Sequence, residues 1–282
     1  MIKISIITVN LNNARGIKKT IKSVIEQNYC SYELIIIDGG STDNSINVIK
    51  HYEDKISYWT SETDNGIYHA MNKGIRQANG EYCYFLNAGD YFVNNTVLEK
   101  IFMSNSDTSI LVGNILMTRD EIVRIEKYSD ITFGLFFTGS ICHQATFIKR
   151  DLFNKYGFYD ESLKIVADWK FFLISIILNN ESVKYLDVDI AYHDLFGISI
   201  IENKLFFKER EKVLKEIIPP RILKDYASNW ADTKIISILN KNVFIKYLLN
   251  FCYKFMNKVD RIAKKREIKR LNEYYIFSSK NK

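Results

Sequence analysis

The sequence predicts an α/β fold, in which an open, mostly parallel sheet is flanked by helices and followed by a helical, basic C-terminal extension. Short β-branched runs alternate with helically spaced apolar residues along the first third of the chain, and each run ends in polar residues. Hydrophobic residues make up 47% of the 282 residues, which is enough for a sizeable core.

Four apolar runs have the composition of buried parallel strands. They are Lys3–Val9, Glu33–Ile37, Ile56–Thr60 and Tyr82–Leu86. The segments between them have helical spacing, so a helix is expected in each. The apolar positions are Ile17, Ile21, Val24 and Ile25 in the first, Ile46, Val48 and Ile49 in the second, and Ile67, Ala70, Met71 and Ile75 in the third, within Gly66–Asn79. This alternating order predicts the parallel sheet.

The second half of the chain is less regular. Strands are expected at 110–116, 123–128 and 184–190, and helices at 168–178 and 202–218. The only two prolines, Pro219 and Pro220, follow the last of these helices. Because proline cannot continue a helix, they predict a boundary between a domain at residues 1–218 and an extension at residues 219–282.

The net charge of +6 is distributed unevenly. Residues 201–282 hold 20 Lys and Arg against nine Asp and Glu, whereas residues 1–200 hold 19 against 24. This indicates an anionic partner for the tail, either nucleic acid or an anionic membrane. The four cysteines form no C-x-x-C pair, no signal peptide is visible, and no apolar run reaches the ~20 residues of a membrane span, so a cytoplasmic location is expected.

Polar residues follow each of the four early strands. The first is followed by Asn10, the second by Asp38, the third by Asp64 and the fourth by Asp90. One such loop is often only a turn or a helix cap, but four in register predict a ligand cleft at the carboxyl ends of the strands. Carboxylates so close together would repel a phosphate unless a cation lies between them, so Mg²⁺ or Mn²⁺ is expected.

An ordered series of motifs over residues 3–92 resembles family 2 glycosyltransferases. The series is Ser5–Asn10, Glu33–Asp43, Asn65-Gly66, Asn72-Lys73-Gly74, Gly80-Glu81-Tyr82 and Phe85–Asp90. The resemblance implies the GT-A fold, a nucleotide-sugar donor such as a UDP-sugar, a divalent metal and inversion at the anomeric carbon. Among family members, bacterial enzymes of polysaccharide or O-antigen assembly are the most similar in type.

The resemblance also implies roles for individual residues. Those that would bind the donor are Thr8, Asn10, Asp38, Gly39, Asp64, Asn65, Asn72, Lys73 and Asn87. Asp38 would accept a hydrogen bond from the base. Two positions depart from the family pattern. Met71 stands where family members often have an arginine, so a phosphate contact is missing or made by Lys73. The usual D-x-D motif is replaced by Asn87-Ala88-Gly89 followed by Asp90, which leaves one carboxylate for the metal.

An inverting transfer needs a general base to take the proton of the acceptor hydroxyl. By resemblance that base is Asp168, although the position could also be a helix N-cap. His143, Gln144 and Trp169 are candidates for acceptor binding, and His193 for a late metal or phosphate contact. A single histidine is more often structural, and His51 and His69 are expected to be surface or packing residues.

The basic tail has an apolar helical stripe between residues 243 and 263, and residues 241–270 hold ten Lys and Arg against two Asp and Glu. It could be a helix packed on the catalytic domain, or an interfacial helix on anionic lipid, which we favour. Because no nucleic-acid-reading motif accompanies the charge, nucleic acid is not expected as a partner. A peripheral location on the inner face of the bacterial cell membrane follows, with a lipid-linked or polysaccharide acceptor.

Two other classes of protein remain open. An enzyme that forms sugar nucleotides would need a Gly-rich, basic loop near the N-terminus, and residues 10–16 contain only Arg15 and one glycine. A non-catalytic or weakly active nucleotide-sugar binder tethered to the membrane is compatible with the altered D-x-D, although the presence of both Asp90 and Asp168 speaks against it.

Overall fold

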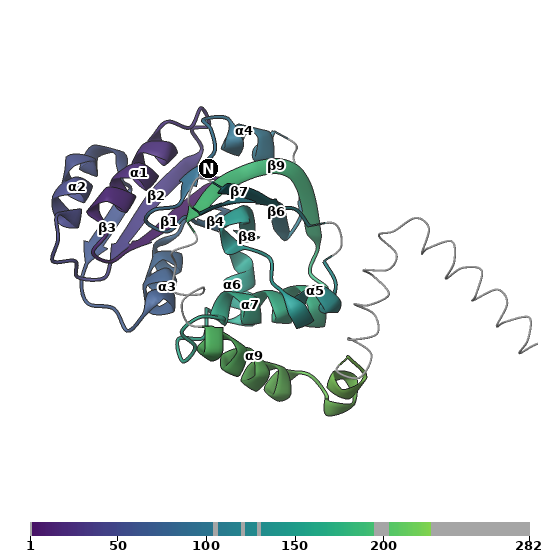
Figure 1. Ribbon diagram of the computed structural model, residues 1–282. Helices are drawn as coiled ribbons and strands as arrows, with labels where there is room; N and C mark the ends of the chain where they lie inside the picture. Colours follow the sequence, from purple (N-terminus) through teal and green to yellow (C-terminus); the bar gives the residue numbers. More distant parts are fainter. Residues whose placement is uncertain (1, 104–106, 120–121, 129–130, 195–202, 227–282) are drawn as a thin grey trace, which may run out of the picture. The chain divides into compact units, whose positions relative to one another are not determined.

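The computed structural model describes residues 2–103, 107–119, 122–128, 131–194 and 203–226. Its strands form one nine-stranded sheet in the order β3-β2-β1-β4-β8-β6-β9-β5, with β7 paired to β6 (Figure 1). The predicted α/β class is confirmed, and the sheet has a parallel half and a mixed half.

The parallel half contains the four strands expected from the early apolar runs. They are β1 (Ile4–Asn10), β2 (Tyr32–Asp38), β3 (Tyr58–Ser61) and β4 (Tyr82–Phe85). The pairings among these four strands are parallel, and β1 lies between β2 and β4. Every residue of β1 is buried, as a strand covered on both faces requires.

Helices cover both faces of this half. On one face lie α1 (Ala14–Ile25), α2 (Ser45–His51) and α4 (Val97–Phe102), whose apolar residues join Ile6 and Leu34 in one core. On the other face lie α3 (Ile67–Gln77), α6 (Asp151–Tyr156) and α7 (Ala167–Phe172) (Figure 1). Gly74 of α3 approaches β1 so closely that a Cβ atom there would lie 2.4 Å from the Ile7 side chain.

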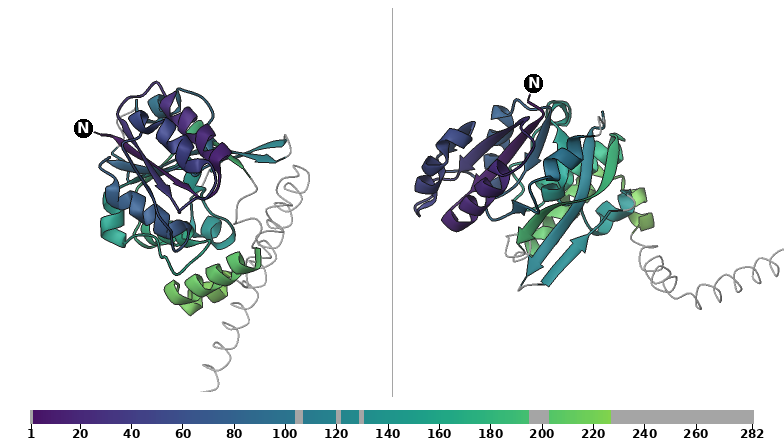
Figure 2. Two further views of the ribbon diagram at one scale, coloured as in Figure 1. Left: turned by 90° about the vertical axis from the view of Figure 1, so that its left-hand side faces the viewer. Right: turned by 90° about the horizontal axis from the view of Figure 1, so that it is seen from above.

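The mixed half begins at β8 (Thr146–Lys149), which runs antiparallel to β4. The long strands β6 (Ile110–Arg119) and β9 (Val183–Asp194) pair in parallel beyond it, side by side in Figures 1 and 2. The short β5 (Tyr91–Phe92) pairs with β9, and β7 (Ile122–Glu126) pairs with β6. The sequence predicts β6, β7 and β9, but β5 and β8 are too short for a period to be visible.

The remaining elements are short, apart from one. They are η1 (Glu53–Lys55), α5 (Phe133–Thr138), η2 (His143–Ala145), the π-helical turn η3 (Leu173–Leu178) and the longer α9 (Asn203–Ile217). Together α7 and η3 span the helix predicted at 168–178, and α9 matches the one predicted at 202–218.

An aromatic stack fixes the register of the short β5. Tyr91 lies opposite Tyr192 in the ladder, their ring centroids are 4.9 Å apart, and the Lys19 ammonium lies 3.4 Å from the centre of the Tyr91 ring. Since successive side chains alternate between faces, the neighbouring pair Asp90 and His193 points to the opposite face. A one-residue slip of β5 against β9 would turn Asp90 to the other face and separate it from His193.

The chain divides into two units, Met1–Val213 and Leu214–Lys282. The basic segment at 241–270 lies outside the described residues, so the predicted extension at 219–282 and its boundary stay predictions. None of the described helices combines the length and the apolar character that crossing a bilayer requires.

Candidate active site

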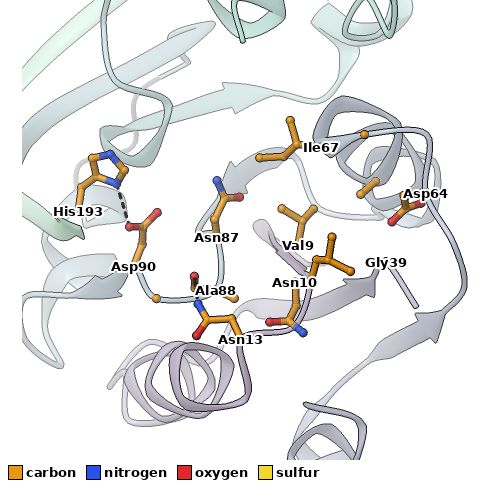
Figure 3. Close-up of a pocket in the computed structure, with 14 residues that line it drawn as sticks. Val9, Asn10, Asn13, Gly39, Asp64, Ile67, Asn87, Ala88, Asp90 and His193 are labelled. Carbon is orange, nitrogen blue, oxygen red and sulfur yellow. Dashed lines mark hydrogen bonds and ion pairs between the residues drawn. The ribbon is translucent and has the colours of Figure 1, made fainter. Parts of the chain in front are cut away.

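A pocket of about 550 Å³ lies at the carboxyl ends of β1, β2 and β4, with the start of α3 and the end of β9 forming other parts of its wall (Figure 3). This is the edge at which open α/β sheets bind ligands. Six of the residues singled out in the sequence line it, namely Asn10, Gly39, Asp64, Asn87, Asp90 and His193.

Asp38 lies directly behind the wall of the pocket and is fully buried. Its carboxylate accepts hydrogen bonds from Asn10 Nδ2 and the hydroxyl groups of Ser41 and Ser61, each at 2.6 Å, and from the Ser41 amide at 2.8 Å. Burial alone would raise the pKa of Asp38, but these donors outweigh it and hold the pKa below its ordinary value. The carboxylate therefore anchors Asn10 and the loop after β2. Its predicted contact with a base stays a prediction.

Buried polar atoms without a protein partner occur in the same wall. Among the described residues, Thr8 Oγ1, Asn10 Oδ1 and Asn87 Oδ1 have no hydrogen-bond partner. Leaving such atoms unpaired costs about 1–3 kcal/mol each, and Asn10 and Asn87 line the pocket. Thr8 is fully buried and does not line the pocket, and a ligand could reach the Asn10 and Asn87 oxygens only if their amides turned toward it.

A small cluster of charges surrounds Asp64, next to Gly39 in the wall of the pocket. Its Oδ1 atom lies 2.6 Å from Lys73 Nζ and 3.1 Å from His69 Nδ1, and Lys73 also contacts Glu62 at 2.8 Å. Two carboxylates therefore neutralise Lys73, so its predicted phosphate contact would require these ion pairs to rearrange. His69 does not line the pocket itself but contacts Asp64, which does.

Two predicted contacts are not supported by where the structure places the residues. Asn72 is 1% exposed, and its amide bonds the backbone N–H and C=O groups of Tyr159 and the Glu161 carboxylate, so its polar atoms already hold the 157–161 loop. Trp169 is 2% exposed and donates its indole N–H to the Phe136 carbonyl oxygen. We therefore correct the direct donor contact of Asn72 and the direct acceptor contact of Trp169 to packing roles, because neither offers a polar atom to the pocket.

Asp90 and His193 face each other at one end of the pocket (Figure 3). Asp90 Oδ1 lies 2.9 Å from His193 Nδ1, and Gln144 Nε2 donates to Asp90 Oδ2 at 3.1 Å. The Cys142 thiol contacts Gln144 Oε1 at 2.8 Å, which fixes the amide with its nitrogen toward Asp90. The pair combines a carboxylate with an imidazole, and both ligate divalent metal ions.

A hydrogen bond joins the two side chains, since Asp90 Oδ1 and His193 Nδ1 lie 2.9 Å apart. A divalent cation bound by both would have to replace the proton of this hydrogen bond. No cluster of three His, Cys, Asp or Glu that could hold a metal occurs among the residues that the structure describes. Because Asp90 and His193 supply only two ligand atoms, substrate oxygens and water would complete the coordination.

A second carboxylate–imidazole pair lies beside the first. His143 Nδ1 is 2.8 Å from Asp168 Oδ2, and the Tyr68 hydroxyl lies 2.8 Å from Asp168 Oδ1. His143 Nε2 lies 3.3 Å from the Asn87 amide at the pocket wall. The sequence left open whether Asp168 is an N-cap, but Val166 occupies that position and the Asp168 carboxylate points to His143 and Tyr68 instead.

Asp168 is held ionised. Burial alone would raise its pKa, but the hydrogen bond and charge of His143 and the Tyr68 hydroxyl outweigh burial and lower the pKa below its ordinary value. Burial and the neighbouring Asp168 carboxylate raise the pKa of Tyr68 well above its ordinary value, so Tyr68 stays a proton donor. A carboxylate that is ionised near neutral pH and lies behind an imidazole is a proton-transfer arrangement.

Sequence reasoning missed several residues of this region. Tyr68 and Asn13 carry no motif of their own, yet Tyr68 contacts Asp168 and Asn13 lines the pocket. The signal available for Tyr68 was its place one turn before Asn72 on the predicted helix. Asn65, predicted at the donor, lies at the exposed entrance next to the pocket residue Gly66.

The sequence matches the family model for Glycosyl transferase family 2 over residues 5–165. A "PGL/p-HBAD biosynthesis glycosyltransferase" of Mycobacterium tuberculosis is 30% identical over 211 residues, which cover 72% of this chain and 82% of that protein. The chain belongs to glycosyltransferase family 2. A second M. tuberculosis relative, an uncharacterized glycosyltransferase, is 35% identical over 176 residues, which cover 60% of this chain and 67% of the relative. Sugar transfer is therefore the activity of this family 2 enzyme, as the sequence predicted.

Solved structures agree on the fold. Staphylococcus aureus TarS superimposes with a TM-score of 0.63 at 19% identity, covering 77% of this chain and 40% of TarS. The mannosyltransferase PcManGT from Pyrobaculum calidifontis, in complex with GDP-Man and Mn²⁺, gives a TM-score of 0.56 at 15% identity, covering 88% and 78% of the two chains. The predicted GT-A fold is confirmed, and at these identities the likeness concerns the fold alone.

Proposed function

We propose that this family 2 glycosyltransferase is an inverting, metal-dependent enzyme. It moves a sugar from a UDP-sugar to a hydroxyl group of a lipid-linked or polysaccharide acceptor. The observation that carries the proposal is the pocket at the strand ends, with Asp90 and His193 at one end and the Asp168–His143 pair beside it. A nucleotide-sugar donor is supported by TarS, which was solved with UDP-GlcNAc, and by PcManGT with GDP-Man.

The two carboxylate–imidazole pairs divide the chemistry. Asp90 and His193 would hold Mg²⁺ or Mn²⁺, which when bound neutralises the negative charge of the diphosphate leaving group. Asp168 with His143 forms the basic group that takes the proton of the acceptor hydroxyl as its oxygen attacks the anomeric carbon. A single displacement of this kind inverts the configuration at that carbon. Asn10 and Asn87 line the pocket, where their side chains would contact the donor.

The alternative function, a non-catalytic nucleotide-sugar binder, is not favoured because the curated relatives are named as glycosyltransferases. The deciding experiment incubates the protein with UDP-glucose, UDP-galactose, UDP-GlcNAc and GDP-mannose, each with Mn²⁺, and follows nucleoside diphosphate release. Proton NMR of the product then reports the anomeric configuration. Release from a UDP-sugar with inversion is expected, whereas binding without release from any donor would support the non-catalytic alternative.

The acceptor and the location are a further part of this proposal. Residues 241–270 carry ten Lys and Arg against two Asp and Glu, and charges near an anionic bilayer contribute about 1 kcal/mol each. A basic apolar segment of this kind would hold the enzyme on the cytoplasmic membrane face, beside a lipid-linked acceptor.

Vesicle co-sedimentation tests the membrane part. Deleting residues 241–282 should release the protein from anionic vesicles and leave donor turnover intact, because every proposed catalytic residue lies at or before residue 193. Phe251→Asp should weaken binding even at high salt, and Lys254→Glu with Lys258→Glu mainly at low salt. Sedimentation of the truncated protein, or its precipitation, would instead support a helix packed on the catalytic domain.

A further inference from the structure

The proposed base contains two groups, Asp168 and His143, and the structure distinguishes them by what each one faces. Both oxygen atoms of Asp168 already have protein partners, the Tyr68 hydroxyl at Oδ1 and His143 Nδ1 at Oδ2, both at 2.8 Å. Neither residue lines the pocket, but the other ring nitrogen of His143 reaches Asn87, which does. The imidazole therefore lies between the Asp168 carboxylate and the pocket wall.

The hydrogen bonds also fix the tautomer of His143. An ionised carboxylate can only accept, so the proton on the ring must be at Nδ1, facing Asp168. In the neutral ring, Nε2 then carries the free electron pair and accepts from the Asn87 amide at 3.3 Å. That contact is long, and an incoming hydroxyl group can replace it.

The surroundings favour His143 over the other ionisable groups beside it. Burial raises the pKa of the Cys142 thiol, so the thiol stays neutral, and Tyr68 likewise stays protonated. Asn87 Oδ1 has no partner among the described residues. If the Asn87 amide turns, this oxygen can accept a hydrogen bond from Nε2 of His143 once Nε2 is protonated. The Asn87 side chain can therefore hydrogen-bond to both the neutral and the protonated imidazole.

We propose that His143 Nε2 takes the proton of the acceptor hydroxyl, and that Asp168 acts through His143 as a positioning residue that fixes the tautomer and stabilises the imidazolium. The inference rests on the proposed function. In the step, the O–H bond of the acceptor breaks and its proton goes to Nε2. The acceptor oxygen forms a bond to the anomeric carbon, and the bond from that carbon to the phosphate oxygen breaks, its electron pair leaving with the nucleoside diphosphate.

The experiment uses the donor that the wild-type enzyme cleaves fastest among the UDP-sugars and GDP-mannose. It measures the turnover of that donor with Mn²⁺ present and water as the acceptor. His143→Ala should lower kcat by about 10²–10⁴ and change the donor Kd by less than about twofold. Imidazole added to the solution should raise the kcat of the His143→Ala variant by at least about tenfold. The matched control His51→Gln, at an exposed position of α2 away from the pocket, should leave turnover unchanged.

Two results would overturn the inference. One is a His143→Ala variant that turns over within about threefold of the wild-type rate. The other is a slow His143→Ala variant whose rate does not rise when imidazole is added, because a loss of packing alone would give that result. Nitrogen NMR of the His143 imidazole adds a check that does not depend on turnover. We expect an Nδ1–H signal that changes in Asp168→Asn but not in His51→Gln. If no such signal is seen, the pairing of His143 with Asp168 is contradicted. Failure of the proposed function is distinguishable, because then the wild-type enzyme itself cleaves no donor.

Discussion

The two carboxylate–imidazole pairs consist of the same chemical groups, but their surroundings differ. In both pairs a histidine Nδ1 lies close to an aspartate oxygen, at 2.9 Å for Asp90 and His193 and at 2.8 Å for Asp168 and His143. Adjacent residues connect them, since His143 belongs to the second pair and Gln144 donates to the first. Two identical pairs connected by adjacent residues would be redundant if the type of pair alone decided the role.

The neighbours make the difference. Asp90 and His193 line the pocket directly and receive an amide donor from Gln144, so they can turn toward a cation and the diphosphate. Asp168 lies behind His143 and next to the Tyr68 phenol, where a cation would have to displace protein groups. The Asp90 side chain is 6% exposed and the Asp168 side chain 15%, so overall exposure does not distinguish them. We infer that lining the pocket, rather than the type of pair, separates a metal site from a proton-transfer site.

The largest effect is expected from Asp168→Asn. The amide keeps the shape but cannot stabilise an imidazolium, so kcat should fall by about 10²–10⁴ while the donor Kd stays nearly constant. Calorimetry for the Kd and diphosphate release for kcat check this. The matched control Asp151→Asn, at an exposed position on α6, should retain full activity. Near-normal turnover of the Asp168 variant would remove the second pair from the mechanism.

Metal removal tests the first pair. With EDTA, the affinity for the UDP-sugar should drop on the order of tenfold or more, because the pocket carboxylates then face the diphosphate without a cation. In Asp90→Asn the affinity should already be low, and EDTA should add little. Equal calorimetric affinities of the wild-type protein with Mn²⁺ and with EDTA would exclude the metal from donor binding.

A smaller effect is expected from Gln144→Leu. The change leaves Asp90 Oδ2 without its amide donor while keeping the size of the side chain. Outer partners of metal ligands typically contribute 10–100-fold in metal affinity, and we expect about tenfold. Titration of turnover with Mn²⁺ measures it. If instead the rate at saturating Mn²⁺ falls and the Mn²⁺ requirement is unchanged, Gln144 serves the neighbouring His143 rather than Asp90.

The smallest effect concerns stability and pH. The folded protein lowers the pKa of Asp168, so the folded state binds a proton there less readily than the unfolded chain does. The resulting stabilisation is fully present above about pH 4, the ordinary range of Asp, and is lost as the pH falls through the lowered value. The melting temperatures of wild type and Asp168→Asn should therefore converge on acidification. A constant difference from pH 7 to pH 3 would contradict the assignment.

Much of the fold could be predicted because it depends on periodicity. The parallel half has regular apolar runs and helical stripes, and its strands lie where those runs predict. The short β5 and β8 escaped because two or four residues show no period. Within the site, polar strand ends pointed to Asn10, Asn87 and Asp90, but Asn72 was misassigned because a motif position does not reveal which way an amide points. The pairing of His143 with Asp168 and the role of Tyr68 depend on packing between distant segments.

The stacked rings of Tyr91 and Tyr192 have a consequence for the order in which the protein assembles. They fix a two-residue strand that brings Asp90 next to His193, a residue 103 positions later in the chain. Closing so long a segment costs chain entropy that only later contacts repay, so this edge of the sheet forms late. A nascent chain can build the parallel half and the pocket wall at its strand ends well before β9 has been synthesised. The Asp90–His193 pair is completed only when β9 docks, so the proposed cation site is one of the last parts of the pocket to form.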